Sequence, residues 1–151
     1  MGNEPGDLTR DFDETDLVVP LDRMWSATVG LRLSESTDGL PTAVLEVTEA
    51  VCQPLGLVHG GIYACVAEEL ASTATGRAVM PEGRWCVGQS NVTHFLHAAR
   101  LGGTLHAVAR SIHQGRSTWV WDVECSNESG RLCARSTVTM AVRDGPMPGS
   151  R

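Results

Sequence analysis

The sequence predicts an α+β domain in which one antiparallel sheet wraps around a single long helix. Three observations lead to this prediction. Apolar and polar residues alternate with a period of two over most of the chain, which is typical of half-buried strands. Turn-forming residues separate the alternating stretches. One Ala-rich stretch, residues 62–75, instead carries its apolar residues at helical spacing.

The alternating stretches predict six strands, two before the helix and four after it. Their expected bounds are Ala27–Ser34, Ala43–Thr48, Arg84–Leu96, Thr104–Gln114, Ser117–Ser126 and Arg131–Val142. The turns between them are expected at Asp38-Gly39, Gly102-Gly103, Gln114-Gly115 and Asn127 to Gly130. We expect the last three strands to form a meander.

The ends of the chain differ in composition from its centre. Residues 1–16 are acidic and poor in large apolar groups, and residues 144–151 are rich in Gly and Pro, so both are expected to be flexible. Residues 17–143 are expected to form one domain. No apolar run approaches the roughly 20 residues of a membrane helix, and the N-terminus lacks the apolar core of a signal peptide. We therefore expect a cytoplasmic protein with no membrane partner.

Charge and cysteine content exclude several classes of protein. The formal net charge is −6, and no cluster of basic residues predicts a nucleic-acid surface. The five cysteines form no C-x-x-C pair, which argues against a disulfide framework or a zinc knuckle. Buried free thiols are expected. The five histidines form no metal-binding pair on a helix, so no metal is expected, and no G-x-S-x-G motif indicates a serine hydrolase.

The segment before the helix, residues 53–61, carries the strongest functional signal. Gly60 and Gly61 at a helix entrance allow a ligand to approach the backbone and leave N–H groups of the first turn free. Such donors stabilise an oxygen that gains negative charge during acyl hydrolysis. A tight loop with a capping role is the simpler alternative for an isolated His-Gly-Gly segment.

Glu68 lies two helical turns after Gly60 and shares a row on the helix surface with Ser72. On a helical wheel it points away from the apolar stripe, so it is expected to face solvent in a lone subunit. The small residues on the same side of the helix favour close packing against a second protein layer instead. A carboxylate in such a seam is a candidate base or nucleophile. Glu69, at the edge of the apolar stripe, is the second candidate.

Four separated motifs stand in order along the chain: Leu57-Val58-His59-Gly60-Gly61, Ala67-Glu68, Val87-Gly88-Gln89-Ser90-Asn91-Val92-Thr93-His94-Phe95 and His113-Gln114-Gly115-Arg116-Ser117-Thr118-Trp119. Together they resemble the hotdog-fold thioesterases that use a helix glutamate. The likeness runs from about Trp25 to Arg143. It is closest to the 4-hydroxybenzoyl-CoA thioesterase type and extends to phenylacetate-pathway (PaaI-like) and siderophore-pathway enzymes.

The resemblance implies a hotdog fold, with a six-stranded antiparallel sheet around one central helix. It implies hydrolysis of an acyl-CoA thioester with an aromatic acyl group, and no cofactor beyond the coenzyme A that is part of the substrate. It also implies dimers that pair edge to edge and assemble into a homotetramer, a dimer of dimers with sites at the subunit boundary. No nucleic-acid partner is implied.

The resemblance also assigns roles to individual residues. The Gly60 N–H polarises the thioester carbonyl, and Glu68 attacks it or activates water. Gln53 orients the reacting groups and Ser72 holds the water. The catalytic group is therefore Glu68, Gly60, Gln53, Ser72 and His59, and the substrate and CoA contacts are Gly61, Ser117, Thr118, Arg116, Asn91 and His97.

Several alternatives stay open at this point. A hotdog hydratase or dehydratase would keep the bond between acyl group and sulfur intact, and a non-catalytic acyl-CoA-binding module would bind without turnover. A carrier-protein thioester could replace free CoA as the donor. The sequence does not separate a covalent anhydride from a general-base mechanism, since both need the same carboxylate.

Overall fold

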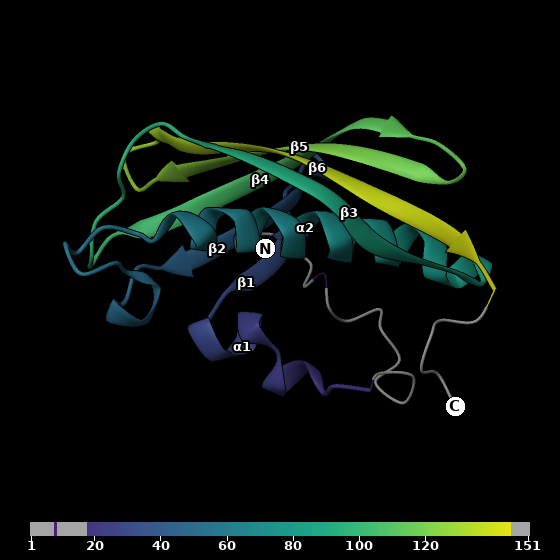
Figure 1. The fold of residues 1–151 in the computed structure, drawn as a ribbon, viewed down its shortest axis with the longest axis horizontal. Coiled ribbons are helices and arrows are strands. Elements are labelled where there is room, and N and C mark those ends of the chain that lie inside the picture. The colour runs from purple at the N-terminus through teal and green to yellow at the C-terminus, as the bar shows by residue number, and fades with distance from the viewer. Residues whose placement is uncertain (1–7, 9–17, 146–151) are drawn as a thin grey trace.

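A single six-stranded antiparallel sheet curves around one long helix, α2, in the computed structural model, which describes residue 8 and residues 18–145 (Figure 1). The strands are β1 (Arg32–Glu35), β2 (Pro41–Glu46), β3 (Arg84–Phe95), β4 (Thr104–Gln114), β5 (Thr118–Asn127) and β6 (Leu132–Asp144). The helices are α1 (Trp25–Val29) and α2 (Gly60–Val79), with 3-10 turns η2 (Leu21–Arg23), η3 (Glu49–Val51) and η4 (Met80–Glu82). This arrangement confirms the predicted fold class.

The strand order in the sheet is β1-β2-β4-β5-β6-β3. The last three strands of the chain, β4, β5 and β6, pair in sequence and form the predicted meander. Strand β3 pairs with the other side of β6. The edges of the sheet are therefore the short β1 and the long β3. The outer edge of β3 has no partner strand within the described residues, and Val87, Val92 and Phe95 are exposed along it.

The core lies between α2 and the concave face of the sheet. Val66, Ala67, Leu70 and Ala71 of α2 are almost completely buried there, and burial of such side chains drives the packing of the two layers. A polar tie fixes their relation, because Trp121 Nε1 on β5 donates to Thr75 Oγ1 at 2.9 Å. None of the helices in the described ranges is long and apolar enough to cross a membrane.

The first predicted strand is wrong over its first half. Residues 27–29 belong to α1, and the chain turns at Gly30, which adopts a left-handed conformation with φ of 75°. Trp25 and Val29 lie four residues apart, one helical turn, and both pack against the core. A short apolar stretch satisfies either period, so alternation alone could not separate a helix from a strand here.

The other predicted elements differ from the structure mainly at their ends. The helix begins at Gly60 and ends at Val79, so it is longer than the predicted residues 62–75 at both ends. The expected flexible ends, residues 1–16 and 144–151, lie mostly outside the described residues. Of these, Leu8 is buried in the core and Asp144 is the last residue of β6.

Candidate active site

The N-terminus of α2 presents one backbone donor that no other described group takes up. His59 is the N-cap residue, and its Nδ1 accepts the N–H of Gly61 at 3.0 Å. No acceptor among residues 18–145 takes the N–H of Gly60. The expectation of free first-turn donors therefore applies to Gly60 and not to Gly61. His59 serves here as a cap, the structural role that the simpler interpretation gave it.

The ring of Phe95 packs against Gly60. A Cβ atom at this position would lie 2.9 Å from Cζ of Phe95, so a side chain there would displace the ring. Phe95 in turn packs against Tyr63, with 6.1 Å between the ring centroids. Gly60 lines a cavity of about 320 Å³ together with Gln53 and His97. The structure thus brings these three sequence-predicted residues together.

Glu68 lies further along α2 and faces strand β3 of the same chain. Asn91 Nδ2 on β3 donates to Glu68 Oε2 at 3.2 Å and to the carbonyl oxygen of Ala64 at 2.9 Å. Glu68 Oε1 lies so close to Gly88 that a Cβ atom at that position would overlap it. Asn91 and Gly88 therefore fix the position of the carboxylate.

A chain of hydrogen bonds orients the Asn91 amide. Thr93 Oγ1 donates to Asn91 Oδ1 at 2.8 Å, which leaves the amide nitrogen to face Glu68. Thr93 also pairs with the hydroxyl of buried Ser136 at 2.8 Å. A side chain held by neighbours on a rigid strand keeps its geometry better than one on a loop.

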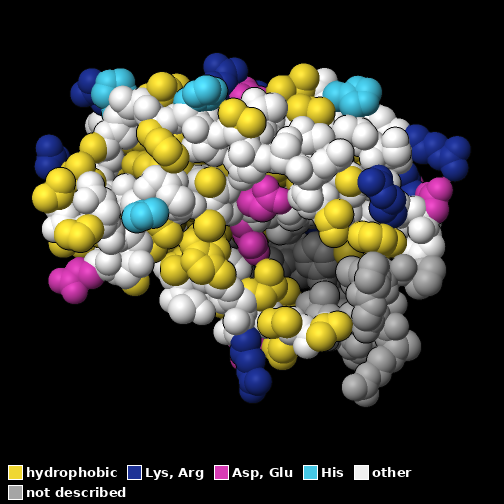
Figure 2. Space-filling model, in the orientation of Figure 1, with side chains coloured by type: hydrophobic (Ala, Val, Ile, Leu, Met, Phe, Trp, Pro, Cys, Tyr) yellow, Lys and Arg dark blue, Asp and Glu magenta, His cyan; other side chains and the backbone are white. Residues whose placement is uncertain are grey.

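The expectation that Glu68 faces solvent in a single chain is wrong. Its side chain is partly buried, because β3 crosses the side of α2 that the helical wheel left uncovered. Acidic side chains stand at the centre of one face of the molecule, over the middle of α2 and beside a hollow (Figure 2). Glu68 borders a cavity of about 390 Å³ together with Trp25, Ala64, Cys65, Glu69 and Asn91.

Glu69 has a different environment from its neighbour. Ser26 Oγ, at the start of α1, donates to Glu69 Oε1 at 3.0 Å. Burial raises the pKa of the Glu69 carboxyl above its ordinary value, and the negative charge of Glu68 acts in the same direction, while the Ser26 hydrogen bond opposes them. Two adjacent carboxylates thus face different partners.

Among the described residues, the hydroxyl of Ser72 hydrogen-bonds to Met140 and not to Glu68. Its Oγ donates to Sδ of buried Met140 at 3.8 Å, and its carbonyl oxygen accepts from Sγ of Cys86 at 3.7 Å.

Burial raises the pKa of the Cys86 thiol to about 11, and the charge of Glu68 adds to this effect. Cys86 is therefore a neutral thiol near pH 7 and a poor nucleophile. Cys65, which is exposed rather than buried as expected, also has a raised pKa, chiefly through desolvation.

The predicted CoA contacts fall into two places. His97 lies at the Gly60 end of α2, where its Nδ1 contacts the carbonyl oxygen of Leu132 at 2.9 Å. Arg116, Ser117 and Thr118 lie in and after the β4–β5 turn, where exposed Arg116 pairs with Asp144 at 3.3 Å. Asp144 pairs in register with Arg84 at the start of β3, while Phe95 at the end of β3 covers Gly60. The two groups therefore lie near opposite ends of α2.

Sequence reasoning missed two residues that shape this site. Gly88 stands inside a recognised motif, but nothing in the sequence shows that a helix carboxylate approaches it. Ser26 carries no motif at all, and only the fold brings it to Glu69. Within the described ranges, no group of three or more His, Cys, Asp or Glu could hold a metal ion.

Comparisons with known proteins agree on one family. Residues 55–134 match the family model described as the thioesterase superfamily. A 1,4-dihydroxy-2-naphthoyl-CoA hydrolase of Listeria monocytogenes is 34% identical over 116 residues, which cover 77% of this chain and 93% of that protein. The proofreading thioesterase EntH of Cronobacter turicensis is 32% identical over 76% of this chain and 82% of its own length.

Solved structures agree with this fold. A variant of a Pseudomonas aeruginosa thioesterase aligns with a TM-score of 0.76 and 35% identity, over 80% of this chain and 86% of that one. The PaaI protein of Escherichia coli aligns with a TM-score of 0.69 over 80% of this chain and 85% of its own, and its 23% identity supports likeness of fold alone.

The raised pKa of Glu69 predicts a pH-dependent contribution to stability. The folded chain holds the Glu69 proton more tightly than the unfolded chain, whose ordinary pKa is 4.5. Stability is therefore lost as the pH rises from that value through the higher folded pKa. We expect the unfolding free energy of the wild type to fall relative to Glu69→Gln between about pH 4 and pH 8. Urea unfolding of both proteins at the two pH values measures this, and a constant difference would contradict it.

Proposed function

Because the chain belongs to the thioesterase superfamily and is a thioester hydrolase, we propose that it hydrolyses an acyl-CoA thioester, with an aromatic acyl group, to the free acid and coenzyme A. Glu68 supplies the hydrolytic carboxylate, and the Gly60 N–H polarises the thioester carbonyl. The observation that carries this proposal is the Glu68 carboxylate, which Asn91 and Gly88 hold beside an open cavity. We propose no cofactor apart from the coenzyme A of the substrate.

Related proteins support the substrate class and the two side chains. The Listeria relative is a hydrolase of an aromatic acyl-CoA by its name. Solved structures of a Staphylococcus aureus relative, 27% to 28% identical, include a glutamine-to-alanine variant and a glutamate-to-alanine variant. The two altered positions are 15 residues apart in that protein, as Gln53 and Glu68 are here. This match supports Gln53 and Glu68 as the reacting pair.

The chemistry needs only groups that this site contains. Either a Glu68 oxygen attacks the carbonyl carbon and the CoA thiolate leaves, after which water hydrolyses the anhydride, or Glu68 takes a proton from water as that water attacks. In both cases the carbonyl oxygen gains negative charge in the transition state. A free N–H at a helix N-terminus, such as that of Gly60, stabilises this charge.

The spacing on α2 supports a site shared between two copies of the chain. Gly60 and Glu68 are eight residues apart, about 12 Å along the helix axis. One thioester carbonyl cannot reach both groups of the same helix at hydrogen-bond distances of about 3 Å. Two antiparallel α2 helices related by an axis near Ala64 would place Gly60 of one copy opposite Glu68 of the partner subunit.

Other features favour the same assembly. The side chains nearest that axis are small, at Gly61, Ala64 and Cys65. A long edge strand with exposed apolar side chains is rarely left uncovered. A second copy that pairs with β3 would supply hydrogen-bond partners to its backbone and cover its exposed apolar side chains. The antiparallel arrangement also brings Arg116, Ser117 and Thr118 of one copy toward the Gly60 end of the other. We propose a dimer of this kind, two of which form the tetramer.

The reaction is tested by following release of free thiol from 4-hydroxybenzoyl-, benzoyl-, phenylacetyl-, hexanoyl- and palmitoyl-CoA. We expect Glu68→Gln to lower the rate by roughly 10²- to 10⁴-fold, because it removes the base or nucleophile. Glu46→Gln, at an exposed carboxylate on β2 outside the cavities described above, is the control. A rate that Glu68→Gln leaves near the wild-type value would refute the assignment. Thiol release also excludes a hydratase or a binding module as the main activity.

The shared site is tested by mixing two inactive variants. Gln53→Ala removes a group at the Gly60 end and Glu68→Gln removes the carboxylate. If the two groups of one site come from different copies, each dimer that contains both variants has one intact site and one doubly altered site. About half of the dimers in a random equal mixture contain both variants, so the population regains about a quarter of the wild-type rate. No recovery after co-refolding would show that each site lies within one chain.

A further inference from the structure

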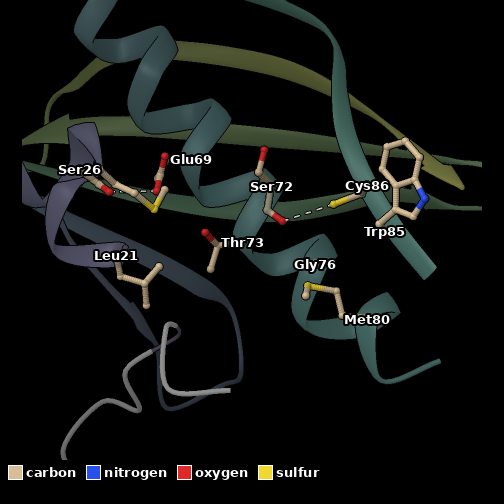
Figure 3. A pocket seen from close by; sticks show the side chains of 10 residues that line it. Leu21, Ser26, Glu69, Ser72, Thr73, Gly76, Met80, Trp85 and Cys86 are labelled. Carbon is tan, nitrogen blue, oxygen red and sulfur yellow. Dashed lines mark hydrogen bonds between the residues drawn. The ribbon is translucent and has the colours of Figure 1, made fainter. Parts of the chain in front are cut away.

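A second cavity, of about 250 Å³, lies beside the Glu68 site (Figure 3). One face of α2 forms its first wall, the start of β3 its second, and the η2–α1 segment its third. The lining residues are Leu21, Met24, Ser26, Glu69, Ser72, Thr73, Gly76, Met80, Trp85 and Cys86. Gly76 has no side chain to fill the space, and the sulfur atoms of the lining suit an aromatic ring.

This cavity continues from the proposed catalytic site. Glu69 borders both this cavity and the one that contains Glu68. Glu69 therefore lies at the passage from the cavity at Glu68 into the cavity of about 250 Å³, where the acyl group attached to the thioester carbonyl would enter. An acyl group bound for hydrolysis at Glu68 can therefore extend between α2 and Trp85.

The carboxyl group of Glu69 is out of keeping with this mostly apolar lining. Ser26 Oγ donates a hydrogen bond to Glu69 Oε1. Glu69 Oε2 has no hydrogen-bond partner in residue 8 or residues 18–145. Figure 3 shows the Ser26–Glu69 hydrogen bond at one side of the cavity. Glu69 Oε2 is not fully buried, so water can reach it in the open cavity, and an acyl group that displaces this water must supply a donor in its place. A carboxyl oxygen accepts such a bond in either protonation state.

We propose that Glu69, positioned by Ser26, determines specificity by accepting a hydrogen bond from a hydroxyl group on the acyl chain of the substrate. The inference rests on the proposed function, since it assigns this cavity to the acyl group of the same thioester. It narrows the substrate class to hydroxylated aromatic acyl-CoA. It also gives Glu69 a role distinct from the reacting carboxylate Glu68.

The test compares esters of similar size that differ in the donor. The kcat/KM values for thiol release are measured for 4-hydroxybenzoyl-CoA against 4-methylbenzoyl-CoA, and for the corresponding 3-substituted pair. In the wild type, the hydroxyl ester of at least one pair is preferred. In Glu69→Met, which keeps the chain length but loses the acceptor, this preference falls roughly ten- to a hundredfold. Comparing the ratio between proteins cancels the intrinsic reactivity of each ester.

Two further variants make the result decisive. Met80→Leu changes the lining without changing a polar group, and we expect the hydroxyl preference to stay within about threefold of the wild type. Ser26→Ala keeps the carboxyl group but frees it, and we expect an intermediate loss of preference even if Glu69→Met folds poorly. An unchanged ratio in both Glu69→Met and Ser26→Ala, or an equal loss in Met80→Leu, would overturn the inference. Absence of thiol release from every ester by the wild type would instead refute the proposed function.

Discussion

The close passage of α2 across strand β3 is the constraint on which the candidate site depends. The helix buries its apolar side against the sheet, and the carboxylate of Glu68 lies against β3 where the two elements cross. Gly88 provides the space and Asn91 provides the hydrogen bond. The packing that completes the core therefore also sets the position of the proposed reacting group.

Two consecutive carboxylates acquire different properties from this packing. Glu68 faces an amide on β3, whereas Glu69 faces a hydroxyl on α1 and has a raised pKa chiefly because it is desolvated. A perturbed pKa alone would have selected Glu69 as the functional residue. The position of Glu68 and the match to the spacing in a related thioesterase are the reasons for proposing Glu68 as the hydrolytic carboxylate and Glu69 as the residue that recognises the acyl group.

Much of the fold followed from local patterns, but the site depends on contacts between distant residues. Alternation predicted the meander and β3, and helical spacing predicted α2, because each signal repeats over many residues. The five residues of α1 were too few to reveal their period. Gly60 and Gln53 were predicted together and do share a cavity. The contacts of Glu68 with Gly88 and of Glu69 with Ser26 join segments 20 to 43 residues apart, which no local pattern encodes.

The most direct test of the link between packing and activity is the rate of thiol release by Gly88→Ala. The added methyl group meets the end of a flexible side chain, so it should displace the Glu68 carboxylate and leave the fold intact. A displacement of this size predicts a loss of roughly a hundredfold in rate with an almost unchanged unfolding midpoint. A full rate in the folded Gly88→Ala variant would contradict the account, because hydrolysis would then not depend on the carboxylate at its position against β3.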